Sequence, residues 1–245
     1  MEIKHAKDIK QGKLFSALIY APPGSGKTST LKYLSGKTLV IDFDRTTDVL
    51  AGSDNIDIVY ADIHHPNLAA KKMLKEIHDT MIADYDNVVL DNISEFERAW
   101  LGEKGRDGKN SGVPELQHYN QYGFYLTDMI RYINSWPGVN KVYTAWEATQ
   151  QVTAPSGQTY NQFVPQLRPS ILNEVMGLMN LVARLVISDK TGERGFILTP
   201  SNATFAKNQV DKREFSLQQD LFKFGGDENL PTPSVPEKTG KPSKK

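Results

Sequence analysis

The strongest constraint on the fold lies in residues 15–30, where an apolar run is followed by a Pro/Gly turn and then by a segment with helical spacing. Residues 15–20 predict a buried strand, and residues 28–34 predict a helix. Strand, tight loop and helix in this order are typical of a loop that binds phosphate groups. The sequence therefore predicts a phosphate-binding loop near the start of the chain.

Each residue type in this loop suits phosphate chemistry. Gly24 and Gly26 have no Cβ, so their backbone can adopt positive φ and approach a phosphate closely. The N–H groups of the turn and of the helix N-terminus form an anion site. Lys27 would reach the β- and γ-phosphates of a nucleotide, and the Thr28 hydroxyl would ligate Mg²⁺. The strict motif has glycine where this chain has Ala21, which is small enough to serve if its φ stays negative. The predicted nucleotide-binding residues are Pro22, Pro23, Gly24, Ser25, Gly26, Lys27, Thr28 and Ser29.

The composition bounds the class of protein. The chain has 245 residues, 39% hydrophobic and 24% charged, which suits one globular α/β domain. Its formal net charge is zero, so a strongly basic nucleic-acid binder is not indicated. It has no cysteine, which excludes disulfides and thiolate metal sites. No apolar run approaches the roughly 18 residues of a membrane span, and the first residues lack a signal-peptide core. We therefore expect a cytoplasmic protein.

Strands and helices alternate along the rest of the chain. Buried strands are predicted at 38–44, 56–60, 87–91 and 141–146, and helices at 66–82, 114–136 and 170–180. Residues 181–187 and 196–199 predict a late β-hairpin, while 101–113 and 148–167 are predicted loops. The alternation predicts an α/β fold with a mostly parallel central sheet flanked by helices, in which ligands bind at the carboxyl ends of the strands. We expect one domain over residues 1–224 and a disordered C-terminal tail over 225–245, where apolar residues are scarce.

Acidic residues end several of these strands. Asp91 closes an apolar strand, where a Walker B carboxylate would hold Mg²⁺ directly or through water; the alternative is a helix cap. Hydrolysis also needs a group that orients or deprotonates water, and Asp44, Glu95 and Glu147 all follow strand ends. Gln150 follows the fifth predicted strand, where it would either sense a γ-phosphate or serve as an ordinary loop residue.

With these residues placed, the chain resembles the RecA-like ATPase core. It is most similar to the phage nucleotide-binding protein family, which includes RecA-like single-strand annealing proteins. The resemblance covers roughly residues 13–215, and its motifs lie in residues 21–28, 39–44, 88–94 and 205–209. It implies a RecA-like P-loop NTPase core that uses ATP and Mg²⁺. In RecA-type recombinases a catalytic Glu ends the second strand, and the resemblance ranks Asp44 first as the catalytic base because it stands at that position.

The resemblance also implies roles outside the phosphate-binding loop. Asp91 and Asn92 match the Asp-Ser of the Walker B strand in the family. Lys207 opens a Lys-Asn-Gln segment similar to the Lys-Asn-Arg of RadA-type relatives, whose lysine reaches the γ-phosphate of a neighbouring subunit. Gln209 departs from that pattern. The predicted catalytic residues are Lys27, Asp44, Gln150 and Lys207.

In RecA-type proteins the loops after the fourth and fifth strands face DNA within a filament or ring. The corresponding segments here are residues 101–113 and 148–166, which hold cations for phosphates and aromatic rings for stacking on bases. The predicted DNA-binding residues are Lys104, Arg106, Lys109, Tyr160 and Phe163. The resemblance further implies a homo-oligomer, with single-stranded DNA and a single-stranded-DNA-binding protein as partners.

Three functions fit these patterns. The first is a weak, DNA-stimulated ATPase that acts on single-stranded DNA in phage recombination or replication, by strand annealing or as a recombination mediator. The second is a nucleotide-gated interaction module with little turnover, which the short Asp44 side chain keeps open. The third is a small-molecule P-loop kinase. The lack of a clear Arg-rich lid argues against this function.

Overall fold

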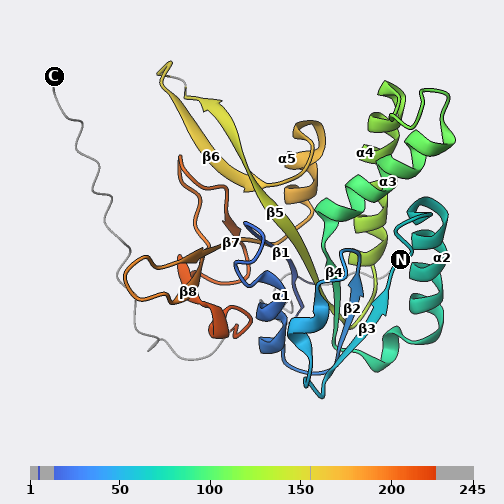
Figure 1. Cartoon of the computed structure of the whole chain (residues 1–245). Helices are drawn as coiled ribbons and strands as arrows, with labels where there is room; N and C mark the ends of the chain where they lie inside the picture. Colours follow the sequence, from blue (N-terminus) through green and yellow to red (C-terminus); the bar gives the residue numbers. More distant parts are fainter. Residues whose placement is uncertain (1–4, 6–13, 155, 225–245) are drawn as a thin grey trace.

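The computed structural model describes residue 5, residues 14–154 and residues 156–224. In that part of the chain ten strands form one sheet with helices around it (Figure 1). The strands are β1 (Ser16–Ala21), β2 (Thr38–Asp42), β3 (Ile56–Tyr60), β4 (Asn87–Asp91), β5 (Asn140–Thr153), β6 (Thr159–Pro165), β7 (Leu181–Ile187), β8 (Arg194–Ile197), β9 (Lys207–Asn208) and β10 (Phe215–Leu217). The α-helices are α1 (Lys27–Thr30), α2 (Pro66–Thr80), α3 (Ile93–Asp107), α4 (Leu116–Asn134) and α5 (Pro169–Gly177). Short 3₁₀ turns are η2 (Leu31–Tyr33), η3 (Thr47–Leu50), η4 (Ile82–Asp84) and η5 (Gln218–Asp220).

The centre of the sheet is parallel. The strand order is β10-β8-β7-β1-β5-β4-β2-β3, and each neighbouring pair from β7 to β3 is parallel. β6 adds to β5, β8 and β9 to β7, and β10 to β8, all antiparallel. The predicted fold class is therefore confirmed: a mostly parallel α/β sheet with a late β7–β8 hairpin. The order places the carboxyl ends of β1, β5, β4 and β2 next to one another.

Alternation along the central strands divides the core into two layers. Leu18 and Tyr20 of β1 point into the larger hydrophobic cluster, which also contains the inner faces of α2, α3, α4 and α5. Ala17 and Ile19 point into the smaller cluster, which holds Leu31 and residues of the C-terminal segment. Both faces of the sheet are thus covered, which explains why these parallel strands are continuous apolar runs.

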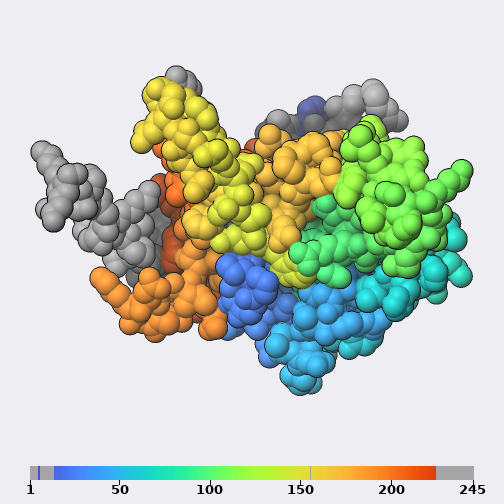
Figure 2. Space-filling model, turned by 45° about the horizontal axis from the view of Figure 1, so that its top comes forward, coloured from blue at the N-terminus to red at the C-terminus, as the bar shows by residue number. Residues whose placement is uncertain are grey.

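The predicted loop over 148–167 is wrong, because β5 continues to Thr153 and pairs with β6 as a hairpin. The hairpin extends beyond the body of the molecule, as the yellow projection in Figure 2 shows. One face carries Ala148, Val152, Tyr160 and Val164 in cross-strand pairs, but the pair Gln150 and Gln162 lies between them. The glutamines interrupt the alternation of apolar and polar residues that would indicate strands in the sequence. Gly157, at the turn, has a φ of 82°, which glycine adopts without strain.

The predicted loop over 101–113 is wrong for its first half, because α3 continues to Asp107. One of the glycines that suggested a loop, Gly105, allows close packing against the helix instead. A Cβ on Gly105 would lie 2.9 Å from the carbonyl carbon of Gly112 and 3.1 Å from the nitrogen of Pro114. Gly105 therefore lets the returning chain lie directly on α3.

Other predicted elements agree with the structure to within a few residues. The first helix is short, since α1 ends at Thr30 and continues as η2, and β2 ends at Asp42, two residues before the predicted end. The predicted tail over 225–245 and most of residues 1–13 lie outside the described residues. Among the helices that the structure describes, none has the length and apolar character that a membrane crossing requires.

Candidate functional site

The loop between β1 and α1 has the geometry of a phosphate-binding loop. Gly24 and Gly26 have φ values of 76° and 104°, in the left-handed region that the sequence predicted for them. The side chain of Lys27 is buried, and its ammonium donates hydrogen bonds to the carbonyl oxygens of Ala21 (3.1 Å) and Pro22 (3.0 Å). Burial lowers the pKa of Lys27, while the carboxylates nearby oppose that shift. The lysine thus lies across its own loop, where a phosphate would be a stronger partner than two carbonyls.

Asp91 lies beside this loop at the end of β4. Its carboxylate accepts hydrogen bonds from the hydroxyls of Thr28 (2.7 Å) and Thr144. Asp91 is 1% exposed, and burial raises its pKa to about 6 even though both hydroxyls favour the charged form. A buried carboxylate next to a threonine hydroxyl supplies the hard oxygen donors that Mg²⁺ prefers.

The protein supplies only part of a magnesium shell here. Within residues 14–154 and 156–224, no group of three or more His, Asp and Glu side chains converges as a metal cage. Mg²⁺ in nucleotide sites is commonly held by one or two protein ligands together with phosphate oxygens and water. Thr28 and Asp91 therefore fit a metal ion that arrives with a nucleotide.

The three candidate acids have different surroundings. Asp44 accepts hydrogen bonds from Asn92 Nδ2 and from the backbone N–H of Thr46 (3.2 Å), and burial raises its pKa. Glu95, in the first turn of α3, also has a pKa raised by burial. Glu147 instead forms an ion pair with Arg184, with 2.7 Å between Oε2 and Nε. Asp44 and Glu95 remain at the site, whereas the carboxylate of Glu147 is already paired.

A cavity of about 560 Å³ joins these parts. This volume lies within the range of small-molecule sites. From the phosphate-binding loop and α1 it is lined by Pro23, Gly24, Gly26, Lys27, Thr28 and Ser29. Across from them it is lined by Phe43, Asp44, Thr46, Val49, Ile63, Asp91, Asn92, Glu95 and Trp146. Of the predicted nucleotide-binding residues, Pro22 and Ser25 belong to the loop but do not line the cavity.

Gln150 and Lys207 do not line this cavity. Gln150 lies on the β5–β6 hairpin, where its amide donates to the Gln162 side chain at 3.2 Å. The Lys207 ammonium donates to the carbonyl oxygens of Gly177 (3.2 Å) and Met179 (2.6 Å) at the end of α5, and burial lowers its pKa. Within this chain Lys207 therefore stabilises the C-terminal end of α5, where a cation is favoured.

The predicted DNA-contacting cations lie on and after α3. Lys104 and Arg106 belong to its last turn rather than to a loop. The Lys104 ammonium lies 5.2 Å from the centre of the Trp100 ring, and the Arg106 guanidinium donates to the carbonyl of His64. Lys109 is exposed in the segment between α3 and α4.

The two predicted stacking residues lie on β6. Tyr160 is partly exposed opposite Val152 on the hairpin. Phe163 is nearer the sheet, where the Arg184 guanidinium covers its ring at 3.5 Å from the centre. Tyr160 thus has a more open ring than Phe163.

Several residues were assigned no contact at the site from the sequence, among them Thr144, Asn92 and Trp146. Thr144 contacts Asp91, Asn92 contacts Asp44, and Trp146 lines the cavity. Thr144 carried a usable signal, because it is a polar residue inside the apolar run of a buried strand. Asn92 was noted only as a motif match. Trp146 resembles an ordinary core residue in the sequence, because its place at the cavity follows only from the course of β5 in the structure.

Fold and site together define a P-loop nucleotide-binding protein: a glycine-rich loop joins a parallel strand to a helix, with Lys, Thr and a buried Asp around one cavity. The chain belongs to the AAA domain family, whose sequence model matches residues 14–210. This membership confirms the predicted class, a P-loop ATPase. The resemblance to phage nucleotide-binding proteins remains a narrower prediction.

No curated protein matches the chain. Among solved structures, the crystal structure of the RadB recombinase is similar, with 15% sequence identity and a TM-score of 0.46. The likeness covers 76% of this chain and 80% of that one. At that level it says nothing about what this chain binds.

Proposed function

We propose that the protein binds ATP with Mg²⁺, hydrolyses it slowly, and acts on single-stranded DNA in phage recombination or replication. The observation that carries the ATPase part is the contact between Thr28 and Asp91, 2.7 Å apart, on a cavity that the phosphate-binding loop also lines. Threonine and aspartate at this distance suit a metal ion that bridges the protein and the phosphates.

Each residue has a distinct part in the proposed reaction. The loop N–H groups and the Lys27 ammonium bind the phosphates, which replace the two carbonyls that Lys27 contacts in the free protein. Thr28 and Asp91 would hold Mg²⁺, which supplies charge neutralisation at the phosphates. Asp44 orients a water molecule and accepts its proton, and its raised pKa suits a general base.

The β5–β6 hairpin is the part proposed to meet DNA. β5 passes from Thr144, which donates to Asp91, through Trp146 at the cavity, and continues into the hairpin that carries Tyr160. One strand, β5, thus runs from the nucleotide site into the projecting hairpin (Figure 1). Lys104, Arg106 and Lys109 would add phosphate contacts, and a homo-oligomer with a single-stranded-DNA-binding protein as partner completes the proposal.

Phosphate release from ATP, measured with and without single-stranded DNA, tests this proposal. We expect hydrolysis that DNA stimulates, and we expect Lys27→Ala to abolish it. Stimulation that is lost in a hairpin variant such as Tyr160→Ala would place the contact on the hairpin. If single-stranded DNA does not change the rate of phosphate release, the proposed action on DNA is refuted, but the proposed ATPase activity is still supported.

A second candidate, the nucleotide-gated interaction module, is favoured by one observation. The Asp44 carboxylate is already engaged by Asn92 and by Thr46, whose hydroxyl donates to it at 2.5 Å. A base held by these bonds activates water poorly. Tight ATP binding without phosphate release, together with a partner captured only in the ATP state, would select this reading.

A further inference from the structure

Two side chains from the last third of the described chain contact the outer side of the phosphate-binding loop. Arg194, at the start of β8, donates a hydrogen bond from Nε to the carbonyl oxygen of Ser25 at 2.9 Å. Gln218, in η5, donates from Nε2 to the carbonyl oxygen of Gly26 and to the Thr30 hydroxyl, both at 3.0 Å. We call Arg194 and Gln218 the loop clamp.

The clamp depends on the glycine at position 26. A Cβ there would lie 3.1 Å from Arg194 Nε and 3.3 Å from Gln218 Nε2, closer than side chains normally pack. Gly26 therefore has two functions: it allows a φ of 104°, and it leaves space for the two donors. A chance surface contact would not require this close approach from two separate elements.

The carbonyls that the clamp holds determine where the phosphate-binding N–H groups point. A trans peptide is planar, so the C=O of one residue and the N–H of the next point in opposite directions. Holding the Ser25 carbonyl on the outside turns the Gly26 N–H inward. The Gly26 carbonyl accepts the Thr30 backbone N–H (3.1 Å) and the Thr30 hydroxyl (3.0 Å) as well as the Gln218 amide, and these bonds together turn the Lys27 N–H inward. These are N–H groups of the kind that bind phosphate oxygens in such loops.

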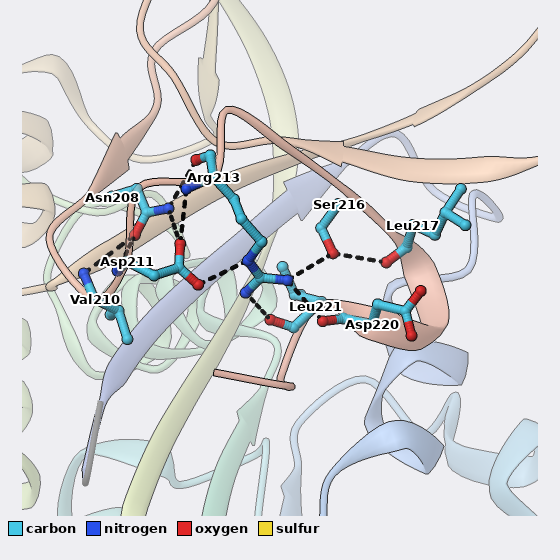
Figure 3. A network of polar contacts seen from close by, with 8 residues as sticks. All are labelled: Asn208, Val210, Asp211, Arg213, Ser216, Leu217, Asp220 and Leu221. Atoms are coloured by element: carbon cyan, nitrogen blue, oxygen red, sulfur yellow. Dashed lines mark hydrogen bonds and ion pairs between the residues drawn. The ribbon is translucent and has the colours of Figure 1, made fainter. Parts of the chain in front are cut away.

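A second polar network is centred on Arg213 (Figure 3). The Arg213 guanidinium donates to the Asp211 carboxylate (2.7 Å) and to the carbonyl oxygens of Asp220 (2.8 Å) and Leu221 (3.0 Å). These two carbonyls belong to the end of η5 and the residue after it, so Arg213 fixes the turn that carries Gln218. Gln218 itself is 9% exposed.

We propose that Arg194 and Gln218 are positioning residues for nucleotide binding, because they hold the phosphate-binding loop with its N–H groups directed at the phosphates. The inference rests on the proposed function, since it concerns the same nucleotide. Arg194 also brings a positive charge to the loop, which adds to the attraction for phosphate. Gln218 lies beyond residues 14–210, so the family match does not reach this part of the clamp.

The test compares Arg194→Met and Gln218→Met with Lys190→Met. Lys190 is an exposed cation in the turn of the same β7–β8 hairpin and is a matched control for loss of charge. Binding of ADP with Mg²⁺ is measured by calorimetry, and KM and kcat are measured for ATP hydrolysis. Thermal unfolding shows whether each variant is folded, and hydrogen exchange of residues 22–30 is followed in the nucleotide-free protein.

We expect both clamp variants to bind ADP about tenfold more weakly. KM should rise with kcat nearly unchanged, because the clamp acts on binding rather than on the attacking water. Exchange in residues 22–30 should be faster than in the control, which should behave as wild type. ADP affinities within about twofold of wild type in both variants would overturn the inference.

The exchange measurement separates this inference from the proposed function. If the wild-type protein binds no nucleotide, the proposed function is refuted. Hydrogen exchange of residues 22–30 then tests by itself whether Arg194 and Gln218 hold the loop. Faster exchange in both variants would still support a clamp on the loop. Unchanged exchange would refute it.

Discussion

Asp44→Asn tests how this site would break the terminal phosphate bond. In the wild-type protein the Asp44 carboxylate accepts Asn92 Nδ2–H on one oxygen and contacts Thr46 on the other. Asparagine keeps the shape and one oxygen for Thr46, but its own Nδ2 would face Nδ2 of Asn92, donor against donor. Asn92 is not free to turn its amide over, because its Oδ1 accepts the backbone N–H of Glu95 at 2.7 Å.

The structure gives separate magnitudes for stability and turnover. Loss of one hydrogen bond to a charged acceptor should lower the free energy of unfolding by about 1.5–3 kcal/mol. Loss of a general base should lower kcat about 10²- to 10⁴-fold. The latter corresponds to roughly 3–5 kcal/mol in the barrier. Nucleotide affinity should change little, since Lys27, Thr28 and Asp91 remain.

The assay is single-turnover phosphate release at saturating ATP and Mg²⁺, beside calorimetric binding and urea unfolding of the same preparation. Glu95→Gln is the matched control, because Glu95 lies on the same cavity and also has a raised pKa. Wild-type turnover in Asp44→Asn with intact binding would refute the assignment. A loss confined to Glu95→Gln would transfer the role to Glu95.

Three further variants test other contacts. Glu147→Gln removes the ion-pair partner of Arg184, and the Glu147 and Arg184 side chains are only 8% and 16% exposed, respectively. Urea unfolding should therefore show that the free energy of unfolding falls by about 3 kcal/mol. Burial raises the pKa of Glu97 from 4.5 to about 7, so its stabilising protonated form is fully present below pH 4.5 and lost as the pH rises through 7. The free energy of unfolding of the wild-type protein should therefore be lower at pH 8 than at pH 5, and Glu97→Gln should reduce this difference by at most about 3 kcal/mol. An unchanged difference in the variant would contradict the burial argument. Lys207→Met should lower the free energy of unfolding by about 1–2 kcal/mol, because carbonyl oxygens at the end of α5 lose their hydrogen bonds. Normal ATP turnover by this variant, at concentrations where the protein assembles, would count against a role of Lys207 across subunits.

The parallel core and the loop chemistry could be predicted because their signals are local. The buried strands β1, β2 and β4 are continuous apolar runs. The glycines at positions 24 and 26 indicate a backbone with positive φ, which the structure has there. Asp91 could be placed because a strand end fixes its position relative to the loop. These elements follow from short stretches of sequence and the rules of parallel sheets.

The β5–β6 hairpin and the second half of α3 could not be predicted for the opposite reason. Gln150 and Gln162 interrupt the apolar face of the hairpin, which weakens its alternating pattern in the sequence. Gly105 suggests a turn unless one knows that residue 112 lies against it. The pairing of Glu147 with Arg184, and the contacts of Arg194 and Gln218 with the loop, join residues far apart in the chain. Such contacts follow from the assembled fold rather than from any motif.

The distance in sequence between the phosphate-binding loop and Gln218 has a consequence for how the protein is made. Gly26 and Gln218 are 192 residues apart, and both sheet neighbours of β1, β5 and β7, also come late in the chain. At about 5–20 residues per second, a ribosome needs roughly 10–40 s between these two residues. During this time the nascent loop exists without its supporting strands. Nucleotide can be captured in the native manner only after Gln218 has been synthesised.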